Sequence, residues 1–155
     1  MNKIWIINIK DKRENAGFDS SKAKFDVCFK RGILAIGWVN YKEEDDVNFK
    51  RAINCLKAMK PDDLVWVRNP STGERFICQI TGTTKEEKPG THPTHDDIGH
   101  YVSCKFYAVD DSDLIKFNIL KKRLISRPTV RQSCQADLND MTRDLFKSKT
   151  TGRSI

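Results

Sequence analysis

The sequence predicts an α+β protein, a small mixed or antiparallel β-barrel with short helices at its rim. Its apolar segments are short and rich in β-branched residues, which is typical of strands. Two of them, at 63–67 and 75–83, are separated by Asn-Pro-Ser-Thr-Gly, which predicts a hairpin. Amphipathic stretches fall between the strands on no strict alternating schedule, which favours a barrel over a parallel sheet. At 155 residues the chain fits one domain.

The first elements are a strand and a short helix. Residues 4–9, IWIINI, predict a strand. After a polar loop, Ser20 and Ser21 offer a helix N-cap, and the helix carries Phe25, Cys28 and Phe29 on one face. Gly32 follows where a helix commonly ends in the left-handed conformation.

The run GILAIGW at 32–38 comes next. Its consecutive aliphatic residues predict a strand buried on both faces, and it ends on Gly37 and Trp38. A helix then runs to Lys60, because Pro61 disfavours helical geometry in the residue before it. The buried stripe of that helix is expected to be Phe49, Ile53, Leu56 and Met59.

The second half continues with a strand and two helical segments. Residues 84–99 predict a long polar loop, and residues 100–109, HYVSCKFYAV, predict an alternating strand. Residues 110–124 have helical character, and residues 135–147 predict a last amphipathic helix. We therefore expect one domain over residues 1–147 and a flexible basic tail over residues 148–155.

The net charge of +7 is unevenly distributed. Residues 1–115 hold 18 Lys and Arg against 18 Asp and Glu, whereas residues 116–155 hold 10 against 3. An excess confined to the last quarter indicates a surface that faces a polyanion. A solvated basic helix explains the same charge equally well.

The cysteines and the apolar runs bear on location. The five cysteines are scattered without a CxxC pair, which predicts reduced thiols in a cytoplasmic protein. No apolar run approaches the ~20 residues of a membrane helix, so no membrane partner is expected.

Catalytic patterns are weak. His92, His95 and His100 could ligate a metal, but a loop that carries every ligand must also be ordered by the metal, so a solvated loop is favoured. A metal-dependent nuclease would need paired acids and a lysine on adjacent strands, and only Asp62 or Asp63 with Glu74 come near that pattern. We expect no enzyme, cofactor or metal, with the nuclease as the alternative.

Several motifs occur in an order that resembles a known family. They are IWIINI, GILAIGW, a helix leading into MKPDDLVWV, a strand ending in ITGT, and RLISRPTVRQ. This order, over about residues 3–132, resembles the PUA-like superfamily and its EVE-type domains, found at the N-terminus of modification-dependent restriction proteins. One departure is Asp62, which stands where the family usually has glycine, so that this turn could differ.

The resemblance implies a non-enzymatic domain that binds nucleic acid and recognises a modified or flipped base in an aromatic pocket. Trp38 is the candidate stacking surface, and Gly37 lets the backbone approach the base. Trp5 and Trp66 are further wall candidates, with either Val65 or Trp66 expected to face outward. A structural role in the core is the alternative for each tryptophan.

Phosphate contacts are expected from the basic residues of the last quarter, with DNA favoured over RNA. The residues are Lys121, Lys122, Arg123, Arg127 and Arg131. Arg127 matches the late arginine of the family, and a structural ion pair is its alternative role. A separate effector protein would fit a defence or mobile-element setting. The alternative function is a protein-interaction module, an adaptor or inhibitor on the same fold.

Overall fold

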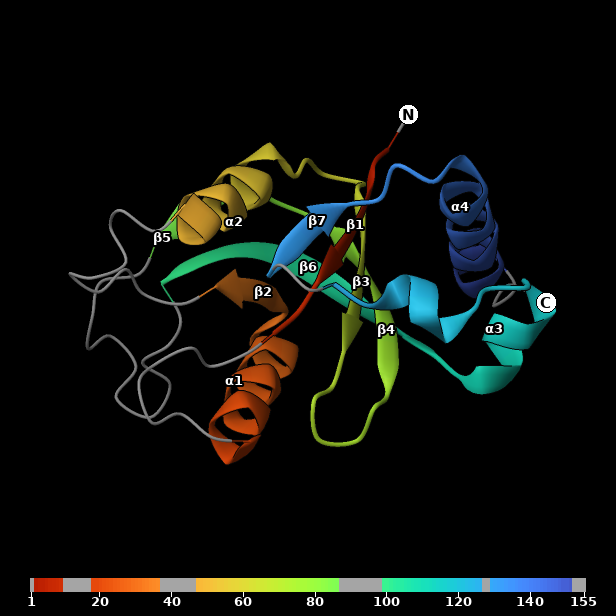
Figure 1. Ribbon diagram of the computed structural model, residues 1–155, viewed down its shortest axis with the longest axis horizontal. Helices are drawn as coiled ribbons and strands as arrows, with labels where there is room; N and C mark the ends of the chain where they lie inside the picture. Colours follow the sequence, from red (N-terminus) through yellow and green to blue (C-terminus); the bar gives the residue numbers. More distant parts are fainter. Residues whose placement is uncertain (1, 10–17, 37–46, 87–98, 127–128, 152–155) are drawn as a thin grey trace.

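A curled mixed sheet with short helices around it forms the protein (Figure 1). The computed structural model describes residues 2–9, 18–36, 47–86, 99–126 and 129–151. The elements in chain order are β1 (Ile4–Ile7), α1 (Phe18–Arg31), β2 (Ile33–Ile36), α2 (Val47–Ala58), β3 (Leu64–Arg68), β4 (Arg75–Ile80), β5 (Lys85–Glu86), β6 (His100–Val109), α3 (Asp111–Lys116), the 3-10 helix η1 (Lys121–Leu124), β7 (Val130–Gln132) and α4 (Ala136–Thr151).

The strand order is β2-β6-β4-β3-β1-β7, and β5 pairs with β6. The pairing of β1 with β3 is parallel, and the other pairings are antiparallel. The long strand β6 pairs with β4 through residues 104–109 and with β2 through residues 100–103, so it carries the sheet around a bend. Helix α2 packs on β6 and β7 across the open side. The predicted α+β fold class with a curled sheet is confirmed.

The sheet is buried on both faces. On β1, Trp5 and Ile7 belong to one apolar cluster, whereas Ile4 and Ile6 belong to a second. Helices α1 and α2 supply side chains to the first cluster and α4 supplies them to the second. Continuous apolar strands are expected where both faces are covered, and the four buried residues of β2 confirm that expectation.

The α1–β2 junction follows the prediction at Gly32, whose φ of +68° is left-handed. A Cβ at Gly32 would lie 3.1 Å from the carbonyl oxygen of Cys104, so the close approach of β6 also favours glycine. The helix begins at Phe18, ahead of the predicted Ser20–Ser21 cap. Phe29 is 49% exposed, although its ring packs on Phe25, Phe76 and Phe106.

The C-terminal part differs from the prediction in three ways. The helical segment at 110–124 is divided into α3 and η1, with Asn118 at a φ of +59° between them. Strand β7 was not predicted. Helix α4 continues to Thr151, so residues 148–151 are helical and not a frayed tail. None of the described helices has the length and apolar character needed to cross a membrane.

Asp62, the departure from the family pattern, has a φ of +76°. Side chains other than glycine are strained there, so Asp62→Gly is expected to stabilise the fold by about 0.5–1 kcal/mol. The loss of the exposed bond from Gln79 Nε2 to Asp62 Oδ1 (3.2 Å) offsets little of this gain. Urea denaturation measures the change. Asp62→Ala is the control, because it keeps the Cβ and should not stabilise; a destabilised Asp62→Gly variant would contradict the expectation.

Candidate nucleic-acid interface

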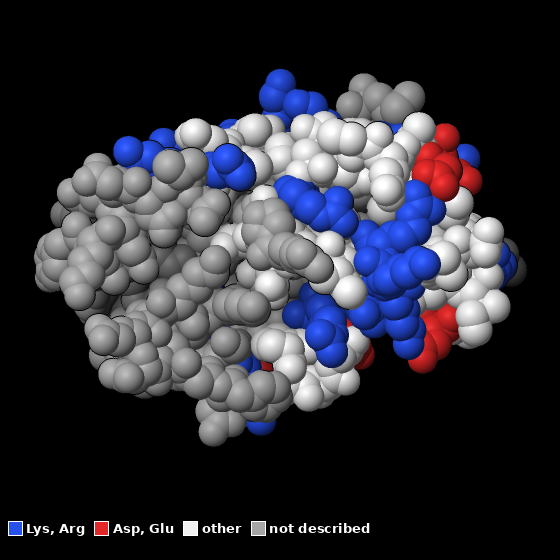
Figure 2. All heavy atoms as spheres, in the orientation of Figure 1, with Lys and Arg blue, Asp and Glu red and all other residues white. Residues whose placement is uncertain are grey.

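Lysine and arginine side chains gather on one face of the protein (Figure 2). They lie over η1 and β7, with others over α2. We call this surface the basic band and define it by Lys50, Arg51, Lys121, Lys122, Arg123 and Arg131. The band joins α2 to η1 and β7, which lie much later in the sequence, because α2 packs on β7 and β7 follows η1 in the chain.

The turn η1 presents two lysines to solvent. Leu124 is buried in the core and anchors the turn, which leaves Lys121 and Lys122 on its outer side. The Lys121 Nζ lies 3.0 Å from Asp111 Oδ1, and its side chain remains 54% exposed. Lys122 is exposed and has no ion-pair partner within the described residues. Both ammonium groups are therefore placed to meet an anion.

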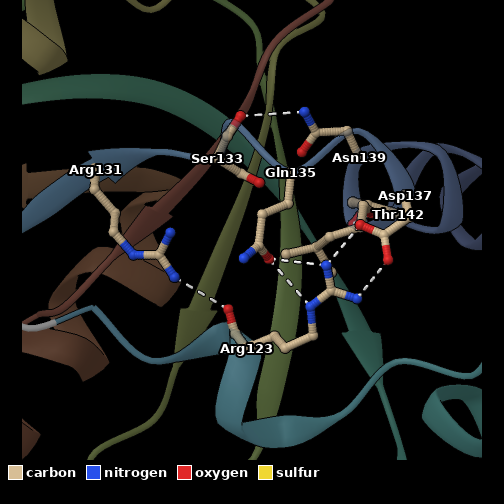
Figure 3. Close-up of polar contacts among 8 residues, drawn as sticks. Arg123, Arg131, Ser133, Gln135, Asp137, Asn139 and Thr142 are labelled. Carbon is tan, nitrogen blue, oxygen red and sulfur yellow. Dashed lines mark hydrogen bonds and ion pairs between the residues drawn. The ribbon is translucent and has the colours of Figure 1, made fainter.

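Arg123 is held inward, in contrast to the two lysines (Figure 3). Its guanidinium donates to both carboxylate oxygens of Asp137, at 2.9 and 2.7 Å, and to Gln135 Oε1 at 3.1 and 2.8 Å. The hydrogen bond with Arg123 lowers the pKa of Asp137, and the same bond raises the pKa of Arg123. Four of the five guanidinium donors are used in this clamp between η1 and the start of α4, and the phosphate contact of Arg123 stays a prediction.

Arg131 acts on the same turn from β7. Its guanidinium donates to the carbonyl oxygen of Arg123 at 3.1 Å and to that of Ile125 at 3.0 Å. Arg131 therefore fixes the backbone on which Lys121 and Lys122 stand. The structure places Arg123 and Arg131 as positioning residues for the two lysines.

Three other predicted site residues, Gly37, Trp38 and Arg127, lie outside the described residues.

Trp5 and Trp66 lie in the core. Trp66 is 1% exposed, and its Nε1 donates to Thr142 Oγ1 at 3.0 Å. Trp5 is 2% exposed, and its Nε1 donates to Asp63 Oδ2 at 3.0 Å. Val65 is fully buried too, so the expectation that either Val65 or Trp66 faces outward is wrong. Trp66 therefore offers no open face for a base, whereas Trp5 reaches the wall of a hollow beside α2.

A hollow of about 480 Å³ lies between α2 and the β1–β7 edge. It is lined by Trp5, Lys50, Arg51, Asn54, Cys55, Ala58 and Gln132. Residues 1–115 hold equal numbers of basic and acidic residues, so their net charge of zero does not indicate a basic surface at Lys50 and Arg51. A local count over α2 would have found them, because the helix holds Lys50, Arg51 and Lys57 and no acidic residue.

Aliphatic side chains are also exposed beside the lysines. Leu120 is 54% exposed and Ile125 is 60% exposed, on either side of η1. Ile115, on α3, is 80% exposed. Leu120 and Ile125 thus border the lysines of the basic band as individual exposed aliphatic side chains.

Two of the candidate catalytic groups, His100 and Asp63, are buried, whereas Asp62 and Glu74 are exposed. His100 is a buried residue of β6, not part of a loop, and His92 and His95 lie outside the described residues. Asp63 is buried and accepts hydrogen bonds from Trp5 Nε1 and two backbone N–H groups. The described residues contain no cluster of three or more potential metal ligands.

His100 should make stability depend on pH. Burial lowers its pKa below the usual 6.5, Lys57 adds to the effect and Glu86 opposes it. The unfolded chain then takes up the proton more readily, so stability falls as the pH drops below about 6.5 and is retained above it. In urea denaturation at pH 7.5, 6.5 and 5.5, His100→Asn should lose less stability than the wild type on acidification. Equal losses in both proteins would contradict this.

The comparisons with known proteins found similarity in solved structures alone. No protein-family model and no curated protein matches the chain. The YTH domain of the Zygosaccharomyces rouxii MRB1 protein, solved in complex with N6-methyladenosine RNA, is 12% identical with a TM-score of 0.47 over 93% of this chain and 86% of that chain.

Two further structures have similar values. Protein Atu2648 from Agrobacterium tumefaciens is 12% identical with a TM-score of 0.43 over 92% of each chain. The DUF55 domain of human thymocyte nuclear protein 1 is 13% identical with a TM-score of 0.45 over 92% of this chain and 97% of that chain.

Proposed function

We propose that this protein is a non-enzymatic, PUA-like domain that binds nucleic acid through the basic band. The proposal rests on the arrangement of basic side chains around η1. Two arginines are hydrogen-bonded inward and fix the turn, and Lys121 and Lys122 stand exposed on it. Fixed ammonium groups on one surface are suited to phosphates, whose neutralisation releases counterions.

Lys50 and Arg51 extend the same surface onto α2, so the band has cations on α2, η1 and β7. A backbone that crosses from η1 to α2 would pass over β7, where Arg131 lies. Phosphate contacts of this kind position a strand without specifying its sequence. The proposal therefore covers DNA and RNA alike.

We further propose that the domain recognises a modified or flipped base, as the resemblance to EVE-type domains implies. Trp38 is the side chain assigned to stack on that base, with Gly37 beside it. A link to restriction or defence systems, through a separate effector protein, belongs to the same proposal. These finer statements rest on the motif GILAIGW and on the order of motifs along the chain.

Charge reversal at Lys121 and Lys122 tests the basic band. The double variant Lys121→Glu/Lys122→Glu should weaken binding to duplex DNA and single-stranded RNA, and should flatten the plot of log affinity against log salt by about two units. Fluorescence anisotropy between 50 and 200 mM salt measures both quantities. Lys22→Glu, an exposed lysine on α1, is the control for net charge. Equal binding by all three proteins, or no binding at low salt, would contradict the proposal.

The same titrations test base recognition. Oligonucleotides that carry cytosine, methylcytosine or hydroxymethylcytosine at one position should differ in affinity for the wild type. Trp38→Ala should weaken binding to the preferred base by about 1–3 kcal/mol while the melting temperature is retained. A large stability loss, with no preference among the bases, would assign Trp38 to the core.

A protein-interaction module is the second candidate, and the exposed Leu120 and Ile125 favour it. In that case an acidic partner with an apolar patch would cover η1, and Leu120→Ser with Ile125→Ser would abolish partner capture. Binding carried by apolar contacts would change little between 50 and 200 mM salt, in contrast to nucleic-acid binding.

A further inference from the structure

A second hollow lies at the tip of the β3–β4 hairpin. Its volume is about 640 Å³, and all of its lining residues are described. The hairpin, the end of β6 and the start of α3 form its wall, with Lys121 and Lys149 also lining it. Lys121 is its one residue shared with the basic band.

Two arginines of this hollow lie side by side on the neighbouring strands β3 and β4. Arg68 and Arg75 are direct partners in the register of β3 and β4. Side chains at such positions have Cβ atoms about 4.5–5.5 Å apart, and like charges there are destabilising. Burial lowers the pKa of Arg75, and the charge of Arg68 lowers it further, whereas Asp111 opposes the shift. Neither arginine has an ion pair within 4.0 Å among the described residues.

The nearby carboxylates are largely engaged elsewhere. Asp111 pairs with Lys121 at 3.0 Å. Asp110 caps α3, accepting from the backbone N–H of Asp113 at 2.8 Å. Glu74 is exposed and has no ion pair in the described part of the chain. The hollow thus keeps two guanidinium groups whose charge no carboxylate contact neutralises.

The turn at the tip leaves room for one of these groups. Gly73 has a φ of +78°, and a Cβ on it would lie 3.5 Å from Arg68 Nη2. The Arg68 guanidinium therefore lies beside the backbone of the turn, at the wall of the hollow. A guanidinium presents paired N–H donors that match the oxygens of a phosphate group.

We propose that this hollow binds a phosphate group between Arg68 and Arg75. The anion accepts hydrogen bonds from both guanidinium groups and removes their mutual repulsion. Lys121 and Lys149 also line the hollow, where they are ion-paired with Asp111 and Asp113 of α3. The phosphate is either a free ion or the terminal phosphate of a nucleic acid, and both have the same oxygens for these donors. The site does not require that the basic band bind nucleic acid.

Titration of the full chain with inorganic phosphate tests the site. At constant ionic strength, with chloride as the replaced anion, the wild type should bind phosphate and gain thermal stability. Arg68→Gln and Arg75→Gln should each weaken phosphate binding by about tenfold or more and abolish the shift in melting temperature. Lys22→Gln, an exposed lysine on α1 outside both the hollow and the basic band, is the control and should bind phosphate as the wild type does.

Folding of the variants is checked without phosphate, where relief of the repulsion should keep both melting temperatures at or above that of the wild type. Equal phosphate affinity in all four proteins, or no phosphate-dependent shift in the wild type, would overturn the site. Oligonucleotides with a 5′-phosphate and a 5′-hydroxyl then identify the source. A terminal nucleic-acid phosphate gives the phosphorylated strand an advantage that both hollow variants lose. A free phosphate ion gives no such advantage while inorganic phosphate still binds.

Discussion

Replacing Trp66 with alanine is expected to lower the free energy of unfolding by about 3–5 kcal/mol. The indole is 1% exposed and lies in the cluster that joins the sheet to α4. Its Nε1 donates to Thr142 Oγ1 at 3.0 Å, which ties β3 to α4. Truncation of the indole both leaves a cavity in the core and removes the hydrogen bond to Thr142. Urea denaturation of the two proteins measures the loss.

Two smaller changes separate packing from hydrogen bonding. Trp66→Phe keeps an aromatic ring and should cost less than Trp66→Ala. Thr142→Val leaves the indole N–H without its acceptor and should cost about 1–3 kcal/mol. If Trp66→Ala cost less than about 1 kcal/mol, the indole would not have the core role that its burial indicates.

Asp63→Ala is expected to cost about 3 kcal/mol or more, because it leaves the buried Trp5 Nε1–H and two partly buried backbone N–H groups without their acceptor. The Asp63 carboxylate accepts from Lys3 N at 2.9 Å, Trp5 Nε1 at 3.0 Å and Lys60 N at 3.1 Å. It therefore joins the start of β1 to the turn before β3. The same denaturation measurement applies.

Neighbouring substitutions are the controls for Asp63. Asp63→Asn keeps one acceptor oxygen and should fall between the wild type and Asp63→Ala. Asp62→Ala removes an exposed carboxylate and should cost much less. Similar losses for Asp62→Ala and Asp63→Ala would mean that the three hydrogen bonds contribute little.

The sequence predicted those elements whose signal lies in their own residues, such as an alternating apolar pattern or a turn motif. Strand β6 has the predicted bounds of 100–109, and the hairpin of β3 and β4 follows its turn residues. The three-residue β7 escaped prediction because its strand partner among the described residues is β1, where Trp5 pairs with Gln132. A strand defined by a distant partner leaves little trace in its own sequence.

The sequence predicted that the candidate site is basic, but not which of its basic side chains are exposed and which are hydrogen-bonded to other parts of the protein. The sequence indicated a basic surface near residues 121–131, and the structure places Lys121 and Lys122 exposed there. Arg123 was expected to touch phosphate, but its acceptors Gln135 and Asp137 come from a separate element 12 and 14 residues away. No helical or strand periodicity indicates that contact. Burial of the tryptophans likewise depends on which helix covers which face.

The position of β1 between β3 and β7 has a consequence for how the chain reaches its native state. Strand β1 cannot pair until β3 and β7 have been synthesised, because Trp5 pairs with Val65 and with Gln132. Such distant pairings carry a large loop-closure entropy and slow folding toward the order of milliseconds to seconds. Until residues 130–132 emerge from the ribosome, one edge of the apolar strand β1 remains open to other chains, so the nascent chain is prone to aggregate until β7 has been synthesised.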